Sequence, residues 1–140
     1  MTRGAGARRQ RGQTTVEFAL IGTVFFFLLI GALETGRAIY GVNAVANGAR
    51  EGARYAIAQA NGNGACNSSN PGLLNAVNAS TQGLKVTVTA IQGTTTLGNP
   101  QDAYCQVEVD WSFQPADNSF GLPTIPVTST SRHYYYNNLQ

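Results

Sequence analysis

Charged residues are scarce in this chain, and the groups that catalysis or metal binding requires are scarcer still. Asp, Glu, Lys and Arg make up 11% of the 140 residues, and there are two cysteines and one histidine, His133. A zinc site needs about four nitrogen or sulfur ligands, and these residues are scattered without a metal-binding pattern. A lone histidine also lacks the partners that acid–base catalysis uses. The sequence therefore predicts a protein that is not an enzyme and that holds no cofactor or metal.

Positive charge is scarce everywhere except at the N-terminus. Four of the nine basic residues precede Gly12, whereas the rest of the chain holds five basic and seven acidic residues, a formal charge of −2. A body of that sign offers no basic face for phosphates. Nucleic-acid binding is therefore not expected.

What the sequence does contain is an uncharged apolar run. Residues 18–33 are flanked by Glu17 and Glu34. As a helix this run covers about 24 Å, slightly less than a hydrocarbon core of about 30 Å. Including residues 13–16 lengthens it to a spanning helix but places the Glu17 carboxylate inside the membrane, where a charge needs a partner.

The helical pattern continues beyond this run. Small or apolar residues recur at helical spacing as far as residue 60, namely Ile39, Val42, Ala46, Ala49, Ala53, Ala56 and Ala60. Gly48 and Gly52 stand at GxxxG spacing, which is either helix filler or a face for close helix contact. The sequence predicts one helix over residues 13–60 that is membrane-embedded in its first half and amphipathic in its second.

The C-terminal region, residues 61–140, has a different pattern. Asn70 and Pro71 predict the N-cap and first turn of a short helix that ends near Gln82. Apolar and polar residues then alternate, most clearly over residues 105–113, and residues 127–136 form a further β-prone run. We expect an α+β fold in which the long N-terminal helix is followed by a small antiparallel β-sheet domain.

Cys66 and Cys105 are either two buried thiols or a disulfide. A location outside the cytoplasm would favour the disulfide. Cys105 belongs to the apolar side of the clearest strand, so its side chain is expected to point inward. A bridge would then tie the loop after the long helix to that strand.

Three interpretations of the N-terminal segment remain open. A secretory signal peptide needs a small-x-small cleavage site close to the apolar run, and the nearest, Ala44-Val45-Ala46, lies far beyond it. A single-span anchor would keep the basic N-terminus in the cytoplasm. Cleavage after Gly12 would instead create an α-amino group at Gln13, about one helical turn from Glu17. That amine could neutralise the carboxylate within the chain or in a neighbouring chain.

The order of motifs in residues 8–58 resembles that of the TadE-like pseudopilins of the tight adherence (Tad, or Flp) pilus. The motifs are RGQ followed closely by VEFAL, then ETGR, then AREGARYA. The resemblance implies a class III, prepilin-type leader over residues 1–12 and a prepilin peptidase that cuts between Gly12 and Gln13. It also implies that Glu17 acts in assembly. Phe18 follows where processed members usually have tyrosine, and it begins the surface expected to pack helices together.

The same resemblance implies a structural function as a minor pilin or pseudopilin, or as a filament-forming subunit, in a pilus used for surface adhesion. The expected partners are other pilin subunits of the same or a different kind, the prepilin peptidase, the inner-membrane assembly platform and the membrane. The chain would lie in the inner membrane before assembly, with residues 61–140 outside the cytoplasm, and in the extracellular pilus afterwards. The alternative is a single-span, membrane-anchored binding or adhesion protein that does not enter a filament.

We predict that the mature chain begins at Gln13, because the basic leader ends at Gly12 and Glu17 is the fifth residue after the expected cut. Intact-mass measurement on protein from cells with and without the peptidase should show loss of residues 1–12 only where the peptidase is present. An assembled form that retains residues 1–12 would contradict the prediction.

Overall fold

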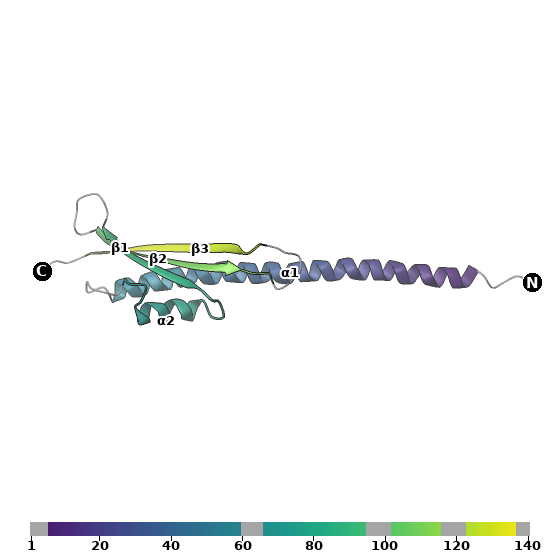
Figure 1. Ribbon diagram of the computed structural model, residues 1–140, viewed down its shortest axis with the longest axis horizontal. Helices are drawn as coiled ribbons and strands as arrows, with labels where there is room; N and C mark the ends of the chain where they lie inside the picture. Colours follow the sequence, from purple (N-terminus) through teal and green to yellow (C-terminus); the bar gives the residue numbers. More distant parts are fainter. Residues whose placement is uncertain (1–5, 60–65, 95–101, 116–122, 137–140) are drawn as a thin grey trace, which may run out of the picture. The chain divides into compact units, whose positions relative to one another are not determined.

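A computed structural model describes residues 6–59, 66–94, 102–115 and 123–136. Two helices, α1 (Gly6–Ala58) and α2 (Pro71–Ser80), are followed by three strands, β1 (Thr87–Thr94), β2 (Asp102–Phe113) and β3 (Ile125–Tyr136) (Figure 1). The strands form one antiparallel sheet in the order β1-β2-β3. This architecture confirms the predicted α+β fold, with a long N-terminal helix and a small antiparallel sheet.

The chain divides into two compact units, Met1–Arg37 and Ala38–Gln140, which we call the N-terminal and C-terminal units. Two expected boundaries therefore differ from the structure. Helix α1 begins at Gly6 and not at Gln13, so the second half of the basic leader is helical. The globular part begins at Ala38 and not at residue 61, because the second half of α1 belongs to its core.

Residues at its two ends determine where helix α2 begins and stops. The Asn70 side-chain oxygen accepts hydrogen bonds from the backbone N–H groups of Gly72 and Leu73 at 2.9 and 3.3 Å. Pro71 occupies the first turn, where a missing N–H costs nothing. The helix ends at Ser80, two residues before the expected end, and Gly83 then takes a φ of +83°, which glycine adopts without steric cost.

The sheet follows the predicted alternation. Side chains along β2 alternate between a buried face and an outer face. The buried side chains are Ala103, Cys105, Val107, Val109 and Phe113. On the outer face, cross-strand neighbours Thr87, Asp110 and Thr128 form a polar row, in which the Thr128 hydroxyl donates to the Asp110 carboxylate at 2.6 Å. A strand that alternates in this way buries one face against other elements.

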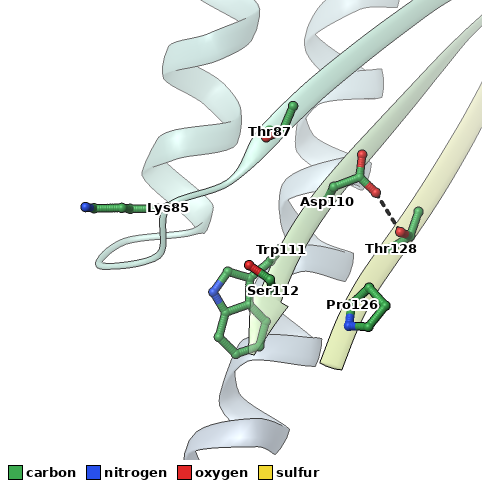
Figure 2. Close-up of a pocket in the computed structure, with 7 residues that line it drawn as sticks. All are labelled: Lys85, Thr87, Asp110, Trp111, Ser112, Pro126 and Thr128. Atoms are coloured by element: carbon green, nitrogen blue, oxygen red, sulfur yellow. Dashed lines mark hydrogen bonds between the residues drawn. The ribbon is translucent and has the colours of Figure 1, made fainter. Parts of the chain in front are cut away.

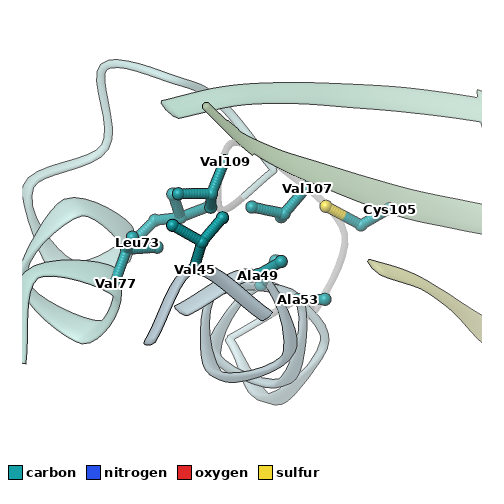
Figure 3. Packing of buried hydrophobic residues seen from close by; sticks show 9 residues of the cluster. Val45, Ala49, Ala53, Leu73, Val77, Cys105, Val107 and Val109 are labelled. Atoms are coloured by element: carbon teal, nitrogen blue, oxygen red, sulfur yellow. The ribbon is translucent and has the colours of Figure 1, made fainter. Parts of the chain in front are cut away.

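The core lies between this sheet, α2 and the second half of α1 (Figure 3). Its buried side chains are mostly small, and they are Val45, Ala49, Ala53, Ala56, Leu73, Val77, Cys105, Val107 and Val109. Ala49, Ala53 and Ala56 of the helically spaced set are buried in this core, whereas Ile39 and Val42 of the same set are exposed. The face that turns inward is the one with the smallest side chains, because these let the helix approach the sheet closely.

Cys66 and Cys105 form the disulfide that the sequence favoured, with their Cα atoms 5.8 Å apart. Cys105 is fully buried in β2, and Cys66 is half-buried in the segment before α2. The hydroxyl of Ser68 in the same segment accepts a hydrogen bond from the Ala90 N–H of β1 at 2.9 Å. The bridge therefore holds the connection between α1 and α2 beside the sheet.

We predict that the disulfide supplies a large share of the stability of the C-terminal unit. The bridge joins residues separated by 39 positions, and closing a loop of that length stabilises the folded state by about 4 kcal/mol in the chain-entropy model. Urea unfolding of the Cys66→Ser, Cys105→Ser variant should show a loss of that order. If alkylation without reductant labels both thiols in protein from outside the membrane, the disulfide does not form there.

Candidate assembly site

The most unusual surface of the chain is the apolar part of α1. Its large side chains are all substantially exposed in the isolated chain, and they are Val16, Phe18, Leu20, Ile21, Val24, Phe25, Phe26, Phe27, Leu28, Leu29, Ile30 and Leu33. The helix is long and apolar enough to cross a membrane. A contiguous apolar surface of this size marks a contact with lipid or with other protein chains.

One face of this segment is hollowed. Leu20, Ile21, Val24, Phe25 and Leu28 line an open apolar cavity of about 400 Å³. The spacing of these residues puts them on adjoining turns of one helix face. Grooves between side chains occur on any exposed helix, and a packed neighbouring helix would fill this one.

Glu17 lies within one turn of that hollow. Its carboxylate accepts a hydrogen bond from the side-chain amide of Gln13 at 3.2 Å. Gln13 and Glu17 are therefore already neighbours on α1, at the spacing of four that brings helix side chains together. The predicted processing position, Gly12, is exposed and lies inside the helix, where nothing within 4 Å would touch an added Cβ.

Among the residues that the structure describes, none buries Phe18, and 77% of its surface is exposed. Its expected role in helix packing can therefore involve only lipid or another chain. It stays a prediction.

Gly48 and Gly52 do make a close helix contact, and the helix they meet is α2 of the same chain. A Cβ added at Gly48 would lie 2.6 Å from Thr81 Cγ2, and one added at Gly52 would lie 2.7 Å from Val77 Cγ2 and 3.1 Å from Val107 Cγ1. These separations are too short for non-bonded carbon atoms. Gly48 and Gly52 therefore pack within the core of the C-terminal unit, and this packing leaves no room there for a helix of a second chain.

A further contact on this face was not foreseen from the sequence. The ring of Trp111 lies directly against Gly41, and it meets Phe113 edge-to-face with ring centroids 5.7 Å apart. The available signal was the helical spacing of Gly41, Gly48 and Gly52, which places all three on one face. Alternation had assigned Trp111 to the inner side of its strand, but it could not identify the glycine beneath it.

Comparison with known families gives one match. A family model described as TadE-like protein matches residues 12–54. No curated protein and no solved structure matches the chain. Residues 12–54 are therefore similar to TadE-like proteins, as the motifs predicted, and this family suggests a pilin-like protein associated with a Tad pilus. The matched segment contains Glu17, the apolar surface and both glycines of the close contact.

We predict that a large side chain at Gly52 destabilises the C-terminal unit, because it would displace Val77 and Val107. Gly52→Leu should lower the free energy of unfolding by about 1–3 kcal/mol or more, the usual cost of overpacking. Thermal unfolding in detergent, followed by near-UV circular dichroism, measures this effect. The matched control is Gly36→Leu on the same helix, where nothing lies within 4 Å of an added Cβ. Equal effects of the two substitutions would refute the close contact.

Proposed function

We propose that this chain is a pilin-like structural subunit of a Tad-type pilus, a minor pilin or pseudopilin that is inserted in the inner membrane and then transferred into a filament. The observation that carries the proposal is the hollowed, exposed apolar surface of α1 together with Glu17 at its start. The TadE-like match over the same residues supports it. The role is structural, and we assign no catalytic step to the chain.

The apolar surface determines where the N-terminal unit can reside. Burial of a large apolar side chain is worth about 1.5–3 kcal/mol, and twelve such side chains are exposed along residues 16–33. Leaving the bilayer for water would therefore cost far more than a folded domain's net stability. Extraction is feasible only if other helices cover this surface at once, as neighbouring pilin subunits would. The hollow lined by Leu20 and Leu28 gives such helices a place to interlock.

Glu17 supplies a reason for the helices to assemble in register. An unpaired carboxylate in an apolar setting is costly, whereas a charge-paired one is tolerated. Cleavage after Gly12 would give Gln13 a charged α-amino group, and the Gln13 side chain already contacts Glu17. In a stack of helices the amine can come from the adjoining subunit. Cyclisation of an N-terminal glutamine would remove that charge and weaken the pairing.

The proposed partners follow from these steps. A prepilin peptidase would release residues 1–12 on the cytoplasmic side, an inner-membrane assembly platform would extract the helix, and other pilin subunits would receive it. The C-terminal unit, with its disulfide, would lie outside the cytoplasm throughout. Surface adhesion would be a property of the completed pilus.

A single-span anchor is the second candidate function. The observation in its favour is that the C-terminal unit has its own core and disulfide, so it could act as a binding module on a helix that never leaves the lipid. The two functions differ in the fate of residues 18–33. They also differ in whether Glu17 is needed.

We predict that Glu17→Gln abolishes incorporation into filaments while expression, membrane insertion and the disulfide remain normal. The substitution keeps the size of the side chain and removes the charge that the α-amine would pair with. The chain in sheared filaments and in membranes would be quantified by immunoblotting. The matched control is Glu51→Gln, which removes a glutamate from the exposed Arg54 pair on the same helix and should cost little. Wild-type incorporation of Glu17→Gln would favour the anchor.

A further inference from the structure

The sheet has a notch at one corner, where β1 does not extend as far as its neighbours. Strand β1 begins at Thr87, which pairs with Asp110 of β2. Strand β2 continues beyond this pair to Phe113, and β3 accompanies it to the end, where Ile125 pairs with Phe113. Residues 111–113 of β2 therefore have a neighbour in β3 and none in β1.

A pocket of about 310 Å³ lies at this notch (Figure 2). Lys85 and Thr87 line it where the chain enters β1, and Asp110, Trp111 and Ser112 line it along the end of β2. All of these residues belong to the C-terminal unit. The volume is at the lower end of the range of small-molecule sites, about 300–1,000 Å³, so the pocket admits a molecule of modest size.

The pocket offers hydrogen-bond donors and acceptors side by side. The Asp110 carboxylate accepts a hydrogen bond from the Thr128 hydroxyl at 2.6 Å, and its remaining lone pairs can accept others. The hydroxyls of Thr87 and Ser112 can both donate and accept, and the Lys85 ammonium can donate. Within the described part of the chain, the side chains of Thr87, Ser112 and Lys85 make no hydrogen bond or ion pair. These groups are therefore available to a ligand.

Two lining residues add carbon surface to these polar groups. The six-membered ring of Trp111 lies against Gly41 of α1, and the indole meets Phe113 edge-to-face, so its position is fixed. These contacts leave Trp111 half-buried, and Pro126, which lines the pocket from β3, is exposed. A ligand that carries both hydroxyl groups and C–H surface would use both kinds of lining.

The charges and the dimensions of the pocket limit the class of ligand. Lys85 and Asp110 offset each other, so neither an anion nor a cation is favoured. The described residues contain no group of three His, Cys, Asp or Glu side chains that could hold a metal ion. The β2 edge exposed in the notch is about 10 Å long, shorter than a usual strand, so a peptide that added there would gain few main-chain hydrogen bonds. A neutral molecule rich in hydroxyl groups matches the pocket best.

We infer that this pocket binds a neutral sugar ring of a glycan, and that the C-terminal unit is a carbohydrate-binding module. A pyranose presents hydroxyls around its edge, each of which donates and accepts, and C–H groups on its faces. Asp110 would accept hydrogen bonds from sugar hydroxyls, and the flexible Lys85 side chain, which extends from the strands in Figure 2, would close over the ring. The site goes beyond the proposed function and does not depend on it, because it lies within the C-terminal unit and would serve a filament subunit or an anchored protein alike.

Binding can be measured on the full chain in a polyoxyethylene detergent, which carries no sugar headgroup. The probes are the methyl glycosides of glucose, mannose, galactose and N-acetylglucosamine, and saturation-transfer NMR detects their binding. We expect at least one of them to bind with a dissociation constant on the order of 1 mM. The emission of Trp111, the single tryptophan, should change over the same concentrations. Absence of saturation transfer to all four glycosides would overturn the inference.

Two variants locate the binding in the pocket. Asp110→Asn keeps the size of the side chain and removes the charged acceptor, and Thr87→Val removes a hydroxyl from an exposed side chain. We expect the first to weaken binding about tenfold or more and the second about threefold, with near-UV circular dichroism unchanged. The matched control is Glu108→Gln, on the same face of β2 but outside the pocket, and it should bind as the wild type does. Unchanged binding by Asp110→Asn, or an equal loss in the control, would refute the site.

Charged and peptide probes test the class of ligand. Glucuronate, glucosamine and triglycine should each bind more weakly than the best neutral glycoside, because the pocket has no net charge and only a short open strand edge. Equal or tighter binding of any of them would overturn the assignment to a neutral sugar. Incorporation into sheared filaments is measured separately, so a failure of sugar binding and a failure of the proposed function are distinguishable.

Discussion

The structure depends on one helix that has to satisfy two different surroundings. In the N-terminal unit, α1 presents bulky apolar side chains on every side and buries none of them within the chain's described residues. In the C-terminal unit the same helix presents small residues to the sheet and to α2, and the close approach at Gly48 and Gly52 closes the core. Bulky side chains suit a surface that contacts lipid or other helices, whereas small side chains suit a surface that packs closely within its own domain.

Under the proposed function, this division keeps assembly apart from folding. Glu17 and the hollow near Leu20 lie in the N-terminal unit, whereas the core and the disulfide lie in the C-terminal unit. A core built mostly from alanine and valine buries little apolar area per residue, so we expect a covalent bridge to contribute a correspondingly large share of the stability. The C-terminal unit therefore has a core and a disulfide that include no residue of the N-terminal unit.

Local chemistry made much of this predictable. The Asn70–Pro71 start of α2 and the alternation in β2 follow from rules that act over a few residues. The pairing of Cys66 with Cys105 was one of two alternatives, because it joins residues separated by 39 positions. The part of α1 that is buried did not follow from hydrophobicity, because the large side chains Ile39 and Val42 are exposed whereas glycine and alanine residues pack closely in the core. The strand register and the packing of Trp111 against Gly41 could not be predicted, because both depend on tertiary contacts that no local sequence pattern encodes.

The central claim is that the apolar part of α1 exchanges lipid for protein. A photo-cross-linking benzoyl-phenylalanine in place of Phe25, which lines the hollow, tests this directly. The account predicts lipid adducts in the membrane fraction and covalent adducts with pilin subunits in sheared filaments. Lipid adducts in membranes, with no chain and no protein adduct in the filaments, would contradict it and leave α1 as an anchor.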